Sequence, residues 1–413
     1  MRVLARATLG FAAAAGLMAV SLTGAMAQFE NAPSFDVARI PGVKPTGENY
    51  QIRNPVQSDG LLRAYRLNTS YGPLPVRGDG MLRMRLTELA ALARLERISN
   101  SEAFGKALAE AGLSPLKYTG QFIANPTKTI GGTVSGIGAL FERAQSGLAN
   151  AGKTQDSALA GLLGVTSERR KLAVHVGVDP YTDYPPLDAK LARLSEAAAA
   201  GGLTVTGAMM AIPGGAGIVI SNLRTASSLE GIKLDALARD FTAAQILDLN
   251  RKRMLAMGTD PRIVEALLVN RSYTPIDMAA MVGALDGMPE VRDRTLYLRR
   301  AAQIDDRTVA YLMREHAELL ASQHARGMRL ERFVSLGGYM FNVVRGGRVV
   351  GVVPIDVLSW TAATTPVWRE SAAEARRVSP AGQVELHITG TATPLAKQEL
   401  KKLGWQVVER TRF

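Results

Sequence analysis

The stretch Val384-Glu385-Leu386-His387-Ile388-Thr389, followed by Pro394–Leu403, Gly404 and Trp405–Glu409, is the most informative about the fold. Apolar residues alternate in the first segment as in a strand, whereas the second has the three- and four-residue spacing of a helix. Gly404 is a suitable end for that helix, because glycine readily adopts the left-handed conformation found after helices. The stretch therefore predicts a strand, a helix and a second strand.

A β-hairpin is predicted shortly before this unit. Two apolar segments, Tyr339–Val344 and Arg348–Val353, flank Arg345-Gly346-Gly347. Glycines between two such segments favour a tight hairpin turn. We expect the hairpin and the strand–helix–strand unit to pack together as a small C-terminal α/β module over residues 330–413.

The sequence from residue 81 to residue 329 is predicted to form a helical domain. Leu86, Leu89, Leu92 and Leu95 recur at helical spacing, and comparable periodicity returns several times up to residue 325. Helix starts are indicated by residues that cap the first turn, namely Thr166 before Ser167, Asp260 before Pro261, and Asp305-Asp306.

Residues 28–80 are rich in Pro, Gly and Asn, and we interpret them as an extended N-terminal arm with short strands. Pro41, Pro45 and Pro55 disfavour helix, and residues 61–78 indicate a short strand followed by a turn. The expected fold class is therefore mainly α, a multi-helix protein with a small C-terminal α/β module, and α+β overall.

The first 27 residues have the three parts of a cleavable secretory signal. Met1–Arg6 is basic, an apolar run extends from Leu9 to Leu22, and Ala25-Met26-Ala27 provides small residues at a cleavage site. The run is shorter than the roughly 20 residues that span a bilayer. We predict cleavage after Ala27 and a periplasmic or otherwise exported protein.

Composition restricts the chemistry and indicates the partner. The chain has no cysteine, which excludes disulfides, thiol nucleophiles and thiolate-bound metals. Its net charge is +12. For an exported protein we expect no nucleic acid partner. We expect instead an anionic lipid, a polysaccharide or an acidic protein, with peripheral membrane contact as one form of binding. The dispersed positive charges are equally explained as solvated helix faces.

Four stretches resemble a group of large exported bacterial proteins: Tyr71-Gly72-Pro73, Gly177–Thr182, Pro354–Trp360 and Leu403-Gly404-Trp405. The resemblance extends along most of the chain after residue 27. It implies no activity, cofactor or catalytic residue.

Two short motifs match the sequence patterns of known active sites. Gly147–Thr154 fits the phosphate-loop pattern, but the segment before it is charged and helical in period, so we interpret it as a helix end and linker and expect no nucleotide. Ser114 and Lys117 have the spacing of serine acyl-transfer enzymes. The companion motifs of those enzymes are missing, so Ser114 is interpreted as a helix cap.

Asp179, Asp183 and Asp188 are the candidate metal ligands, because oxygen-rich loops suit the hard cation Ca²⁺. The same aspartates are also explained as turn and helix-entry residues. No other cofactor is expected. The four histidines, His175, His316, His324 and His387, are interpreted as surface or core-edge residues.

Residues 197–223 contain no charged side chain, and we interpret them as buried or touching lipid peripherally. The leading functional hypothesis is an exported, non-enzymatic cell-envelope protein that binds an anionic lipid, polysaccharide or protein partner. The alternative is a periplasmic hydrolase or calcium-dependent enzyme that uses the Asp179/Asp183 loop.

Overall fold

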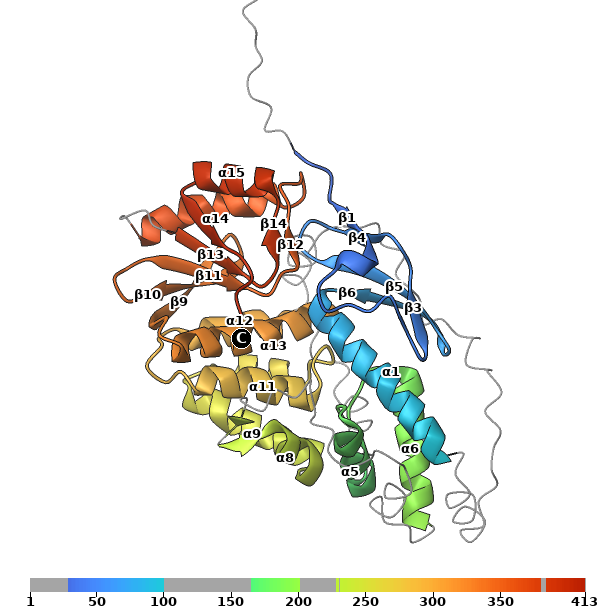
Figure 1. Cartoon of the computed structure of the whole chain (residues 1–413). Coiled ribbons are helices and arrows are strands. Elements are labelled where there is room, and N and C mark those ends of the chain that lie inside the picture. Colours follow the sequence, from blue (N-terminus) through green and yellow to red (C-terminus); the bar gives the residue numbers. More distant parts are fainter. Residues whose placement is uncertain (1–28, 100–164, 201–227, 230, 380–383, 413) are drawn as a thin grey trace, which may run out of the picture.

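The computed structural model describes residues 29–99, 165–200, 228–229, 231–379 and 384–412. Its N-terminal part is an antiparallel sheet of six strands (Figure 1). The strands are β1 (Ser34–Phe35), β2 (Thr46–Gly47), β3 (Tyr50–Ile52), β4 (Val56–Ser58), β5 (Arg63–Thr69) and β6 (Gly72–Arg77).

Strand β5 organises this sheet. The short strands β3 and β4 pair with successive parts of β5, and β6 pairs along its other edge. Pro73 and Pro75 lie in β6, which an edge strand tolerates because its outer N–H groups need no partner in the sheet. Tyr65 and Leu67 of β5 are buried against the helices that follow.

The expected fold class, mainly α with only a small C-terminal α/β module, is wrong. Helices make up 49% and strands 21% of the described structure, and residues 34–77 form a curled half-barrel sheet where an extended arm was expected. The physical reason is that strands of two or three residues have no readable alternation of their own. Strands β3 and β4 form on the edge of β5, and β1 and β2 pair in turn with β4 and β3.

Three helices belong to the same apolar cluster as the N-terminal sheet: α1 (Asp79–Ser99), α5 (Ser167–Val176) and α6 (Pro185–Ala200). Helix α1 begins directly after β6 and runs away from the sheet along α6 (Figure 1). Of the leucines in the predicted helical pattern, Leu89, Leu92 and Leu95 are buried and Leu86 is half-buried.

The second group is a short hairpin, β7 (Ser228–Leu229) and β8 (Ile232–Lys233), followed by helices. The helices are α8 (Leu234–Asp240), α9 (Ala243–Ala256), α10 (Pro261–Leu268), α11 (Pro275–Asp286), α12 (Arg294–Ala302) and α13 (Arg307–Ala325). Helix α11 is buried around its whole circumference between α9 and α13. The predicted caps at Thr166, Asp260 and Asp306 are confirmed, since each side chain accepts a first-turn N–H.

The C-terminal part contains a five-stranded mixed sheet in the order β15-β13-β11-β10-β9. The elements are β9 (Leu330–Leu336), β10 (Tyr339–Val344), β11 (Val349–Val353), β12 (Val357–Leu358), α14 (Thr365–Val378), β13 (Val384–Ile388), β14 (Thr391–Ala392), α15 (Pro394–Lys402) and β15 (Trp405–Val408). The predicted hairpin is confirmed, with Gly346 and Gly347 both at positive φ in its turn. The strand–helix–strand unit is confirmed as β13, α15 and β15.

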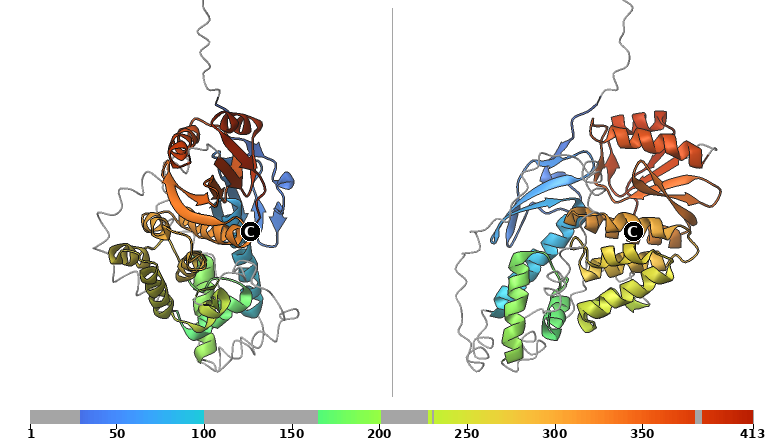
Figure 2. Two further views of the ribbon diagram at one scale, coloured as in Figure 1. Left: turned by 90° about the vertical axis from the view of Figure 1, so that its left-hand side faces the viewer. Right: turned by 180° about the vertical axis from the view of Figure 1, so that it is seen from behind.

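This sheet lies between two helical layers (Figure 2). Helices α14 and α15 cover one face, with Phe341 and Leu386 in their core, and α12 and α13 cover the other, with Met340 and Val350. One apolar core therefore crosses the predicted boundary at residues 329 and 330. Among the described residues, no helix is long and apolar enough to cross a membrane.

Candidate functional site

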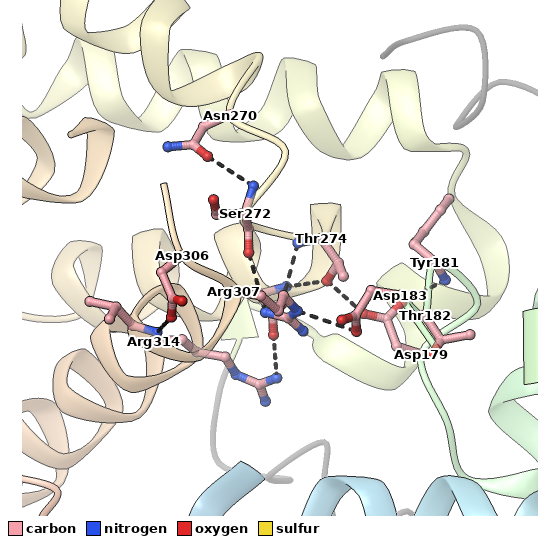
Figure 3. Close-up of polar contacts among 12 residues, drawn as sticks. Asp179, Tyr181, Thr182, Asp183, Asn270, Ser272, Thr274, Asp306, Arg307 and Arg314 are labelled. Carbon is pink, nitrogen blue, oxygen red and sulfur yellow. Dashed lines mark hydrogen bonds and ion pairs between the residues drawn. The ribbon is translucent and has the colours of Figure 1, made fainter. Parts of the chain in front are cut away.

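The loop between α5 and α6 carries Asp179, a sequence-predicted metal ligand (Figure 3). One carboxylate oxygen accepts from the Thr274 hydroxyl at 2.6 Å, and the other accepts from the Tyr181 backbone N–H at 2.8 Å. Burial, and then the nearby Asp277, raise the pKa of Asp179 to about 6. Asp179 thus fixes the loop to the start of α11.

Asp183, the second predicted ligand, is held by two arginines. Its carboxylate lies 2.6 Å from Arg85 and 3.3 Å from Arg307. Burial alone raises the pKa of this carboxyl, but the two guanidinium groups outweigh burial and hold the pKa at about 2. Asp183 is therefore an ionised member of a salt-bridge network.

Asp188, the third predicted ligand, is not brought to the same place. It lies in the first turn of α6 and pairs with Arg169, whose guanidinium also donates to the carbonyl of Pro180. Asp179 and Asp183 line one small cavity, and Asp188 does not.

That cavity lies at a buried network of charges joining α1, α11 and α13. Asp277 lies 2.8 Å from both Arg307 and Arg314, and Arg85 lies 2.7 Å from Glu88. The cavity has a volume of about 30 Å³. Such a space takes a water molecule and no organic substrate, so the network is best explained as a structural cross-link.

No group of three or more His, Asp or Glu side chains suited to a metal ion occurs among the described residues. At the Asp179/Asp183 loop, an added cation would meet the guanidinium groups of Arg85 and Arg307. The calcium hypothesis stays a prediction. The phosphate-loop match at 147–154, the Ser114/Lys117 pair and nearly all of the uncharged segment 197–223 lie outside the described residues.

A second cavity contains carboxyl groups that the sequence did not single out. Asp79, Glu315 and Asp356 line a polar space of about 80 Å³ where the N-terminal sheet, α13 and the C-terminal part meet. Burial and the neighbouring Asp79 raise the pKa of Asp356 well above its ordinary value. The backbone N–H groups of Arg63 and Asp79 donate to the Asp356 carboxylate.

A third pocket, with mostly apolar walls, lies between α13 and the C-terminal sheet. It encloses about 60 Å³. Its walls come from α13, β10, the end of β11 and α14, and they include Val309, Leu312, Met313, Met340, Ile355 and Trp368. This composition is typical of small-molecule sites, which are mostly apolar with a few placed polar groups.

The residues that line this pocket differ in exposure. Gly338 is exposed and Arg300 and Tyr339 are half-buried, whereas His316 and Trp368 are buried. We call the half-buried lining residues Arg300 and Tyr339 the mouth of the pocket, and the buried His316 and Trp368 its inner lining. Burial lowers the pKa of the Arg300 guanidinium, so a carboxylate placed at this mouth would stabilise its charged form.

Two polar atoms of the inner lining are buried and unpaired among the described residues. His316 is 7% exposed, and its Nε2 atom has no hydrogen-bond partner within the described chain. The same holds for the indole Nε1 of Trp368. His324 and His387 differ, since each pairs with a glutamate at 2.7 and 3.0 Å, respectively. An unpaired buried polar atom costs about 1–3 kcal/mol, which a ligand that pairs with it would recover.

None of the family models, curated proteins and solved structures compared with this chain matches it. The candidate site residues therefore rest on the structure of this chain alone. The sequence patterns indicated neither the pocket nor the presence of Arg300 in its wall. His316 could have been found, because it shares a helical stripe with Val309, Met313 and Leu320, all of which are buried.

Proposed function

We propose that this protein is an exported, non-enzymatic envelope protein that binds an anionic amphiphile in the apolar pocket. Export is supported by the signal-like residues 1–27. Among the anionic partners expected from the sequence, the apolar walls favour a lipid over a polysaccharide, whose hydroxyl groups need polar partners throughout.

The observation that carries the proposal is the position of Arg300 at the mouth of the pocket. A guanidinium beside an apolar cavity complements a carboxylate whose alkyl chain enters that cavity. The enclosed space of about 60 Å³ takes the end of an alkyl chain, so the rest of the ligand lies toward the mouth. A carboxylate with a short or medium chain fits this arrangement.

The test is calorimetric titration of the chain lacking residues 1–27 with octanoate and with octanol. We expect octanoate to bind more tightly than octanol. Arg300→Met should remove most of this difference, because it keeps the aliphatic bulk and deletes the charge. Arg299→Met is the matched control, since Arg299 is the exposed neighbour on α12 and does not line the pocket.

Two outcomes would count against the proposal: no binding of either compound, or equal losses in the two arginine variants. Leu312→Trp adds a further check, because a larger side chain in the pocket wall should abolish binding of both compounds. Circular dichroism and the melting temperature must show that each variant is folded.

The alternative function is a hydrolase. One observation favours it: Asp79 and Asp356 lie together in a polar cavity, and the pKa of Asp356 is raised by burial. A carboxyl group with a raised pKa can serve as the general acid beside a second carboxyl group that acts as the base. Hydrolysis of nitrophenyl esters or glycosides, abolished by Asp356→Asn in a folded variant, would favour this alternative over the binding protein.

A further inference from the structure

The buried lining residues of the pocket indicate which further polar groups the ligand carries. His316 lies on α13 with its ring 5.5 Å from that of Tyr297, and Trp368 lies on α14. Both residues line an otherwise apolar space. Both also present a buried nitrogen without a hydrogen-bond partner within the described chain.

The chemistry of these two nitrogens is different. Burial lowers the pKa of His316 to about 4, so the imidazole is neutral near pH 7 and its Nε2 either donates or accepts one hydrogen bond. The indole Nε1 of Trp368 only donates. A ligand oxygen that comes within hydrogen-bond distance can pair with either nitrogen. A plain alkyl chain leaves both unpaired.

We propose that His316 recognises an oxygen carried on the chain of the ligand, so that the preferred ligand class is hydroxylated or oxo-substituted carboxylates. This inference rests on the proposed function, because it assumes that the carboxylate is held at Arg300. A site with a buried polar group discriminates strongly against an analogue that lacks the matching oxygen.

The experiment compares octanoate, 3-hydroxyoctanoate and 8-hydroxyoctanoate by titration calorimetry. The wild-type chain should bind one of the hydroxylated acids about tenfold more tightly than octanoate, since one hydrogen bond of about 1.4 kcal/mol corresponds to a factor of ten. His316→Phe keeps a ring of similar size and deletes both nitrogens. It should bind all three acids equally and change the affinity for octanoate by less than about threefold.

Met340→Leu is the matched control, because it alters an apolar wall and no polar atom. It should retain the preference for the hydroxylated acid. The ¹⁵N resonance of His316 Nε2 provides a second measurement on the unmodified protein. It should shift when the preferred hydroxyoctanoate is added and stay in place with octanoate.

The outcomes separate the two proposals. Binding of octanoate without any preference for a hydroxylated acid overturns this inference and leaves the proposed function intact. A preference that persists in His316→Phe also overturns it. Absence of binding of all three acids overturns the proposed function and this inference together.

Discussion

The backbone N–H of Asp79 donates to both carboxylate oxygens of Asp356, at 3.1 Å each. The N–H of Arg63 donates to the same carboxylate at 2.8 Å. Asp79 begins α1, Arg63 begins β5, and Asp356 lies between β11 and β12. One buried side chain therefore joins the N-terminal sheet, its covering helix and the C-terminal part.

Replacing Asp356 should weaken this junction. Asp356→Ala leaves two N–H groups without their acceptor, and we expect it to lower the free energy of unfolding by about 2–4 kcal/mol in urea denaturation. Asp356→Asn should cost less, because its amide oxygen still accepts. Asp248→Ala is the control, since its pair with Lys252 is exposed and worth little. Equal losses in Asp356→Ala and Asp248→Ala would contradict the assigned role.

Arg307→Met tests the buried charge network. It removes one of the two arginines at Asp277 and one of the two at Asp183. We expect the free energy of unfolding in urea denaturation to fall by about 3–5 kcal/mol, as for other buried pairs that lose one partner. Arg251→Met removes the same side chain from an exposed pair with Glu265 and should cost less than about 1 kcal/mol. Similar losses of unfolding free energy in the two variants would show that the buried network does not stabilise the fold.

His316 should make the protein less stable as the pH falls from 6.5 toward 4. The unfolded imidazole takes up a proton near pH 6.5, whereas the buried one resists protonation until about pH 4. The unfolded state therefore binds more protons in this interval, and acidification favours it by up to about 3 kcal/mol. His316→Phe should flatten this part of the profile of urea midpoint against pH. An unchanged profile would show that the ring is not buried in neutral form.

Asp179 should have the opposite effect over nearly the same interval. Its folded pKa is about 6 against an ordinary 3.8, so the folded state holds an extra proton between these values. The stability that this proton provides is complete below pH 3.8 and is lost as the pH rises through 6. In Asp179→Asn the urea midpoint should decline less from pH 4 to pH 6 than in the unmodified protein. A steeper decline in the variant would contradict the raised folded-state pKa of Asp179.

Millimolar calcium should leave the melting temperature unchanged. Asp183 already has two guanidinium partners, and a Ca²⁺ ion at its carboxylate would have to displace them. Differential scanning fluorimetry with and without the ion measures this directly. A rise in melting temperature that Asp183→Ala abolishes would instead support the calcium hypothesis.

Local signals in the sequence predicted the local parts of the fold. The caps at Thr166, Asp260 and Asp306 involve residues within three positions of their partners, and the hairpin turn needs only Gly346 and Gly347. The N-terminal sheet could not be predicted in this way. Its four short strands depend on β5, so their pairing is a property of the assembled sheet.

The candidate pocket could not be predicted from the sequence for a related reason. Arg300, His316, Tyr339 and Trp368 lie on four different elements, and no spacing along the chain relates them. The aspartates of the α5–α6 loop were visible because they are close in sequence. Their partners Arg85, Thr274 and Arg307 were not, since they come from α1, the start of α11 and α13.

The shared core of the helices and the C-terminal sheet affects the order in which the protein can fold. Tyr297 of α12 contacts Phe333 of β9, and Val350 and Val352 of β11 belong to the same apolar cluster. A nascent chain that ends before β11 therefore lacks part of the wall that shields α12 and α13 from water. Those helices complete this packing only when the chain as far as Val352 is available to it, so the helical core and the C-terminal sheet are expected to fold together.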